Sequence, residues 1–235
     1  GSANLGYESA VFNEMQDFLT AKFHWGTEDE LFFTSMISSF LCLGAIIGVV
    51  ITWFLHDLVG RKTSVVIIDT ILINGSIFTL FANPTFILIG RFISGIGVGM
   101  NTILVPIFLR EISTNDVRGN ICGLNEMTIG IGQFLAYFTD LGLPIPDKNH
   151  KYANLEDQWW RFQFSMPIII SLIRIIGLVY FFKIESPLYL FLNGQTIKAK
   201  EMLTKVVRPD LVDTYMKHME TDKEQYKSSE SVTLK

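Results

Sequence analysis

The sequence is poor in the residues that soluble enzymes use for metal binding and redox chemistry. Its 235 residues include two cysteines and four histidines, and the histidines lie outside the apolar segments or at their ends, without a shared spacing. Cys42 and Cys122 both fall inside apolar segments, so we expect two small buried hydrophobic residues. The sequence therefore predicts neither a disulfide framework nor a metal site.

Other signatures of catalysis and of nucleic-acid binding are missing too. No serine, histidine and acid form a catalytic set, and the glycine-rich string GIGVG lies inside an apolar segment rather than after a strand. The net charge is −4, without a basic patch for nucleic acid. A starting methionine and a cleavable signal sequence are also lacking, which indicates an incomplete or processed start. We expect a protein that is not an enzyme, holds no cofactor and binds no nucleic acid.

What the sequence does contain is apolar segments long enough to cross a bilayer. Hydrophobic residues make up 49% of the chain, and a run of about 20 apolar residues spans the hydrocarbon core. Such runs cover residues 31–56, 63–82, 85–109, 118–142 and 161–183, with a shorter run over 3–20. The connections group these spans as three plus three. We expect an all-α, multi-pass membrane protein with one six-helix bundle.

Basic residues are concentrated on one side of these spans. Arg61 and Lys62 follow the second span, Arg110 and Arg118 lie between the fourth and fifth, and further lysines follow the sixth. Because lysine and arginine are enriched in cytoplasmic loops, these connections are predicted to face the cytoplasm or its equivalent. The pattern leaves open whether the membrane is the plasma membrane or that of an organelle.

The composition changes after the sixth span. Beyond Pro187, apolar residues recur at helical spacing with Lys or Glu on the opposite face. This pattern predicts, on the cytoplasmic side, either an amphipathic helix on the membrane surface or helices that pack against the charged loops. From about Thr221 the chain is polar. We divide it into a six-helix domain at 1–184, a surface or linker segment at 185–220 and a polar tail at 221–235.

Small and charged residues have separate roles in this scheme. Two G-x-x-x-G pairs, Gly44 with Gly48 and Gly95 with Gly99, predict close helix packing rather than ligand binding. Charged residues gather at the cytoplasmic ends of the spans. They are Asp57, Arg61, Lys62, Glu111, Arg118 and Glu185. The residues alone are equally compatible with an ion-pair network that latches one conformation and with ordinary cytoplasmic basic charge beside nearby acids.

Six motifs occur in a characteristic order from Gly1 to about Leu203. They read DLVGRK, GRFISGIGVG, VPIFLREISTNDVRG, LNEMTIGIGQFLAYF, WWR and ESPLYLFLNG. Together they resemble the amino-terminal half of the sugar porters of the major facilitator superfamily, the group that contains facilitative glucose transporters and proton-xylose symporters. The resemblance implies a 3+3 inverted repeat, a sugar or similar polar small molecule as substrate, and a cytoplasmic charge network that stabilises the outward-facing state.

The same resemblance implies roles for four residues inside the spans. Gln133 and the position held by Glu126 would face the sugar, and their spacing of seven places them on one helix face. Glu8 lies where proton-coupled members carry an acid, and Arg91 matches the arginine at the start of the fourth helix. Protonation of Glu8 would release Arg91, so Glu8 favours proton coupling over passive transport.

Several positions depart from the family pattern. Glu126 replaces the usual glutamine, Trp53 replaces a glycine, Leu188 replaces an arginine, and Arg110 is an added base. No segment corresponds to the second six-helix half, so the polar wall of the bundle needs a second half or other membrane subunits. Two hypotheses follow: the amino-terminal half of an alternating-access sugar transporter, or a transporter-derived structural subunit of a membrane complex that no longer transports.

Overall fold

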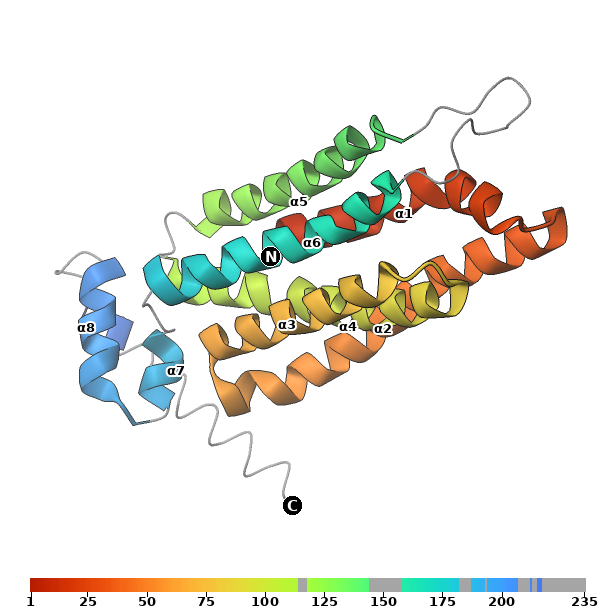
Figure 1. The fold of residues 1–235 in the computed structure, drawn as a ribbon. Helices are drawn as coiled ribbons and strands as arrows, with labels where there is room; N and C mark the ends of the chain where they lie inside the picture. The colour runs from red at the N-terminus through yellow and green to blue at the C-terminus, as the bar shows by residue number, and fades with distance from the viewer. Residues whose placement is uncertain are drawn as a thin grey trace, which may run out of the picture.

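The computed structural model describes residues 1–113, 118–143, 158–181, 187–192, 194–206, 212, 215 and 216, and these form helices joined by turns (Figure 1). The helices are α1 (Ser2–Phe23), α2 (Thr27–Val59), α3 (Arg61–Thr79), α4 (Pro84–Ile112), α5 (Arg118–Asp140), α6 (Trp159–Ile176), η1 (Gly177–Phe181), α7 (Pro187–Leu192) and α8 (Thr196–Val206). All six predicted spans are helical within this part of the chain.

The helix boundaries follow from local chemistry. Gly60 separates α2 from α3 with φ at 84°, a conformation that glycine adopts without the steric cost of a Cβ. Asn83 caps α4 by accepting a hydrogen bond from the Thr85 backbone N–H at 2.9 Å, and Pro84 takes the first position of the helix. The short connections predicted between these spans are therefore tight turns with defined caps.

Helix packing follows the three-plus-three division. The most extensive contacts join α2 to α4, α3 to α4 and α1 to α5, and α3 also packs on α6 (Figure 1). If the two repeats exchange places, α1 corresponds to α4, α2 to α5 and α3 to α6. The α2–α4 and α1–α5 interfaces are therefore equivalent, as an inverted repeat predicts.

Glycines let the helix backbones approach closely at both equivalent interfaces. A Cβ added to Gly99 would lie 2.0 Å from the carbonyl oxygen of Ala45, and one on Gly48 would lie 2.1 Å from that of Ile96. Between α1 and α5, a Cβ on Gly6 would lie 2.0 Å from the carbonyl oxygen of Ile129. The predicted packing role of the G-x-x-x-G pairs in α2 and α4 is confirmed.

Replacing Gly99 with leucine is expected to separate α2 from α4 and to destabilise the bundle. Overpacking costs about 1–3 kcal/mol. Here the added side chain would collide with backbone atoms of α2, which cannot move aside by changing rotamer. The melting temperature of the detergent-solubilised protein measures the effect. Gly123→Leu is the matched control, because nothing lies within 4 Å of a Cβ there. Equal melting temperatures for the two variants would contradict the packing role.

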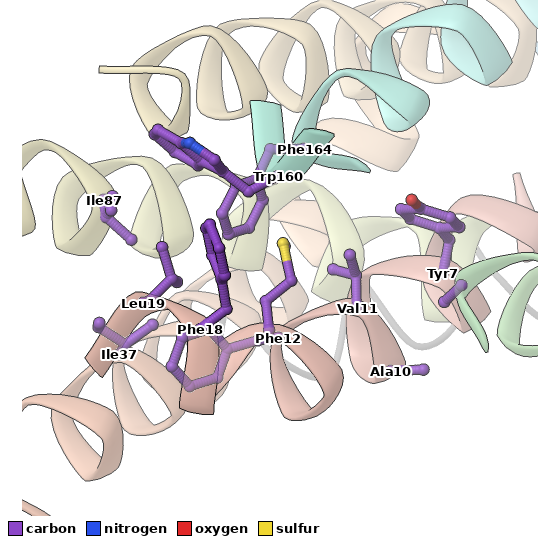
Figure 2. Packing of buried hydrophobic residues seen from close by; sticks show 12 residues of the cluster. Tyr7, Ala10, Val11, Phe12, Phe18, Leu19, Ile37, Ile87, Trp160 and Phe164 are labelled. Carbon is purple, nitrogen blue, oxygen red and sulfur yellow. The ribbon is translucent and has the colours of Figure 1, made fainter. Parts of the chain in front are cut away.

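Three groups of buried aromatic and aliphatic side chains pack within the described helices. In the largest group, Phe12 and Phe18 of α1 lie with Trp160 and Phe164 of α6 (Figure 2). A second group joins α3 to α4, and a third forms a separate core over α7 and α8 that includes Phe191. The predicted domain boundary at 184/185 lies outside the described residues, as does the tail at 221–235.

Some predictions about burial need correction or refinement. Cys42 and Cys122 are free and exposed on the helix surfaces, so their predicted burial is wrong. In a membrane protein the outer surface is itself apolar, and an apolar segment therefore does not locate a residue in the core. Among the described helices, four are long and apolar enough to span a membrane on their own, namely α2, α3, α4 and α6 continuing into η1. The more polar α1 and α5 have 22 and 23 residues.

Candidate functional site: an ion pair and a polar helix face

Glu8 of α1 and Arg91 of α4 form a buried ion pair. The Arg91 Nη1 donates to the Glu8 Oε2 at 2.7 Å, and its Nη2 donates to the Glu8 backbone oxygen at 3.1 Å. Glu8 is 3% exposed and Arg91 2%, and the guanidinium carbon lies 5.6 Å from the centre of the Phe12 ring. The two residues that the resemblance singled out as a proton-coupling pair therefore do meet.

The burial of this pair determines what it can do. Removing one partner from a buried ion pair costs about 3–5 kcal/mol, because an uncompensated charge stays in a low-dielectric interior. Protonation of the carboxylate removes the attraction and leaves the arginine without its counter-charge. A single proton can therefore change how strongly α1 is held to α4.

Helix α5 has three distinct faces. Its first face packs on α1 through buried residues such as Gly132 and Ala136. A second face is exposed and carries Glu126 and Gln133 together with Tyr137. The third face is exposed and apolar, with Leu124, Met127, Ile131, Phe134 and Phe138. The polar face suits a solvated cavity or a partner, and the apolar face suits lipid.

The polar face of α5 adjoins the part of α1 that carries the ion pair. A Cβ on Gly6, two residues before Glu8, would lie 3.1 Å from the Gln133 backbone nitrogen. Glu126 and Gln133 share a face, as their spacing predicts, and both are exposed. Glu8 and Arg91 are buried between α1 and α4, whereas Glu126 and Gln133 are exposed on α5, so the two sets do not share one surface.

At the start of α3 and the end of α4, which the sequence predicts to be cytoplasmic, Arg61 pairs with Glu111. The Arg61 Nη2 lies 2.8 Å from Glu111 Oε1, and its Nε lies 3.0 Å from Oε2, which makes the contact bidentate. The Arg61 and Glu111 side chains are 3% and 9% exposed. Tyr189 of α7 covers the pair, with its ring centre 5.8 Å from the guanidinium carbon. Two members of the predicted gating network are thus in contact.

The rest of that network is described only in part. Glu185 and the side chain of Asp57 lie outside the described residues. Lys62 follows Arg61 in the first turn of α3, and Arg118 begins α5. The buried Nε of Arg118 has no hydrogen-bond partner among the described residues.

The positions that depart from the family pattern lie mainly on the surface. Trp53 is 74% exposed and packs against Phe54, with ring centres 5.1 Å apart. Arg110 is exposed at the end of α4, and the side chain of Leu188 lies outside the described residues. Trp53 therefore changes an outer surface of α2 and leaves the packing of the bundle intact.

Sequence reasoning missed a second buried charged group. Asp69 of α3 is fully buried and is bound by Arg174 of α6, which also contacts Asn101 of α4. The available signal was a charged residue in the interior of an apolar span, Asp69 within 63–82 and Arg174 within 161–183. Nothing in the sequence indicated that these two residues, far apart along the chain, would meet.

Comparison with known proteins places this arrangement among transporters. A family model described as "Sugar (and other) transporter" matches residues 1–235. Hexose transporter 1 of Plasmodium knowlesi is 33% identical over 97% of this chain and 47% of its own length. Inositol transporter 4 of Arabidopsis thaliana is 26% identical over 99% of the chain and 38% of its own. The chain thus spans about half the length of the curated hexose transporters that it matches.

Solved structures support the fold. The proton:xylose symporter XylE bound to 6-bromo-6-deoxy-D-glucose matches with a TM-score of 0.82 and 21% identity, over 96% of this chain and 51% of that one. XylE from E. coli in a partially occluded inward-open conformation matches with a TM-score of 0.81 and 20% identity, over 97% and 58%. At this identity the likeness establishes a shared fold, which is the predicted six-helix half of a major facilitator protein.

Proposed function

Because the chain belongs to the sugar (and other) transporter family, we propose that it forms the amino-terminal half of a sugar transporter working by alternating access. It is an integral, multi-pass membrane protein. The proposed substrate is a hexose-like sugar, since Hexose transporter 1 of Plasmodium knowlesi and of Plasmodium falciparum are 33% and 32% identical to this chain over 97% of its length. The protein would move the sugar without changing it chemically.

A second six-helix half, or other membrane subunits, would complete the molecule. The polar face of α5 supports this proposal, because Glu126 and Gln133 are exposed on a bundle that lies in lipid. Lipid offers their side chains no hydrogen bonds, so a water-filled cavity between two halves is the environment that satisfies them. The sugar would bind in that cavity.

The Glu8–Arg91 pair is the single observation that supports proton coupling. When the carboxylate is ionised, the pair holds α1 to α4 and favours one conformation. When it is protonated, Arg91 loses its counter-charge and the cost of changing conformation alters. A transporter that is not coupled to protons does not require a buried acid at this position. The presence of Glu8 therefore favours a proton symporter.

Gln133→Ala is expected to reduce sugar transport about tenfold or more. The amide can donate to and accept from sugar hydroxyls, and alanine leaves those groups unpaired at the site. The measurement is uptake of radiolabelled hexose by proteoliposomes containing the native protein. Met127→Ala is the matched control, because it shortens a side chain on the apolar face of the same helix. Undiminished uptake by Gln133→Ala would show that Gln133 does not bind the sugar.

The competing function is a structural subunit that no longer transports. Trp53 favours it, because an exposed tryptophan on α2 obstructs the close approach that the family's glycine allows. This alternative predicts that the native protein binds and moves no hexose and co-purifies in near-equal amounts with other membrane subunits. Saturable hexose uptake by the purified protein excludes it.

A further inference from the structure

A second ion pair inside the membrane joins α3 to α6. The Arg174 Nε lies 2.9 Å from Asp69 Oδ1 and 2.7 Å from Oδ2, and its Nη2 also donates to Oδ1. The Nη1 of Arg174 donates to Asn101 Oδ1 at 2.9 Å, and the Asn101 amide donates to the Gly1 backbone oxygen at 2.7 Å. One arginine thus connects α6, α3 and α4, and Asn101 extends the connection to α1.

The two buried pairs occupy related places in the repeat. Glu8–Arg91 joins the first helix of one repeat to the first helix of the other, and Asp69–Arg174 joins the third helix to the third. The symmetry that relates the two repeats exchanges α1 with α4 and α3 with α6. Each of these two interfaces therefore corresponds to itself. In both cases the acid comes from the first repeat and the base from the second.

The two pairs nevertheless differ in geometry. Both carboxylate oxygens of Asp69 accept from Arg174, and the Asp69 side chain is 0% exposed. Arg91, by contrast, divides its donors between one carboxylate oxygen of Glu8 and a backbone carbonyl. A bidentate arginine–carboxylate contact holds both the charge and the orientation of its members. The geometry of Asp69 suits a fixed pair, whereas that of Glu8 suits one that opens.

The position of the cluster also indicates what it holds. Asp69 lies two helical turns after Arg61, or about 12 Å further into the membrane at 1.5 Å per residue. It therefore lies deeper than the Arg61–Glu111 pair on the same two helices, α3 and α4. Helix α6 reaches this point just before η1, where its regular α-helical hydrogen bonding ends.

We propose that Asp69, Arg174 and Asn101 form an ion-pair cluster that positions α6 against α3 and α4, so that the six helices move as one rigid body. The role of this cluster is to hold the helices, and proton coupling is left to Glu8. The separation of the two roles explains why one bundle has two intramembrane ion pairs. The inference rests on the proposed transport function and assigns it two positioning residues and a positioning amide.

The test is a double-mutant cycle of Asp69 and Arg174. It is carried out on the native protein, together with its second half, reconstituted in proteoliposomes. Asp69→Asn and Arg174→Gln each leave a buried charge unpaired and are expected to lower the melting temperature and to reduce the maximum transport rate at least tenfold. The KM for sugar should stay within twofold, because the cluster does not touch the sugar face of α5. The double variant should recover most of both losses, and Arg174→Lys should recover part.

Controls and contrary outcomes separate this inference from the transport proposal. Thr70→Val is the matched control, because Thr70 is exposed on α3 next to Asp69 and bonds only within its helix. A pH profile of transport that shifts in Asp69→Asn would overturn the inference, as would singles that behave like the native protein or a double variant no better than the singles. If the native protein moves no sugar, the proposed function fails, and the four melting temperatures still decide whether the charges act as a pair.

Discussion

A Glu8→Gln protein is expected to exchange sugar across a membrane while losing the ability to accumulate it against its gradient. Glutamine keeps the shape of glutamate and can still accept a hydrogen bond from Arg91, so it imitates the protonated state permanently. A pH difference of one unit is worth about 1.4 kcal/mol per proton, and 1.4 kcal/mol corresponds to a tenfold ratio. If one proton is transported with each sugar, the native protein should therefore concentrate sugar about tenfold at a pH difference of one unit. The Glu8→Gln protein should not concentrate it at all.

The measurement compares two assays on the same proteoliposomes. Counterflow of labelled sugar reports exchange, and uptake driven by an imposed pH difference reports coupling. Glu8→Asp is the matched control, since it keeps a titratable carboxyl group and should retain part of the accumulation. Proton-driven accumulation that persists unchanged in Glu8→Gln would show that Glu8 has no coupling role.

Substitutions of Arg91 independently test the coupling role of Glu8. In Arg91→Ala the Glu8 carboxylate stays buried without its partner, at a cost of about 3–5 kcal/mol. The double change of Glu8→Gln with Arg91→Gln should recover stability and leave exchange without coupling. The comparison separates the structural importance of the pair from its proton chemistry.

The fold could be predicted because membrane-spanning helices can be recognised in a sequence by the length and the apolar character of their segments. The run over 31–56 became α2 (Thr27–Val59), and the run over 118–142 became α5 (Arg118–Asp140). The helix ends extend beyond or stop short of the apolar runs by a few residues, since caps rather than hydrophobicity determine them. The order of the motifs supplied the topology, which periodicity alone does not contain.

The candidate site was anticipated less completely. Glu8 and Arg91 were paired in advance because a family motif marks each of them. Asp69 and Arg174 belong to no motif, and only the fold brings these distant positions together. The exposure of Cys42 and Cys122 could not be inferred either, because segments that face lipid are as apolar as segments in the core.

Loss of the Arg61–Glu111 pair is expected to shift the protein away from its outward-facing state. The pair is bidentate and nearly buried at the predicted cytoplasmic ends of α3 and α4, beside the ring of Tyr189 of α7. If Arg61→Gln removes about 2 kcal/mol of differential stabilisation, the ratio of the two states changes about thirtyfold. An equilibrium near balance would then lie almost wholly on the inward-facing side.

The native Cys122 can report this shift. It is exposed on α5 one helical turn before Glu126, on the same polar face. A membrane-impermeant maleimide applied from the cytoplasmic side should label Cys122 faster in Arg61→Gln than in the unchanged protein, with Cys42 replaced by serine in both.

Two further variants make the labelling result specific to the ion pair. Glu111→Gln removes the other partner and should accelerate labelling as Arg61→Gln does, whereas Arg61→Lys keeps the charge and should have a smaller effect. Arg110→Gln removes an exposed charge next to Glu111 and should leave the rate unchanged. Equal labelling rates in all these proteins would mean that the pair holds α3 to α4 equally in both states and does not act as a gate, because a contact that two conformations share cannot shift the balance between them.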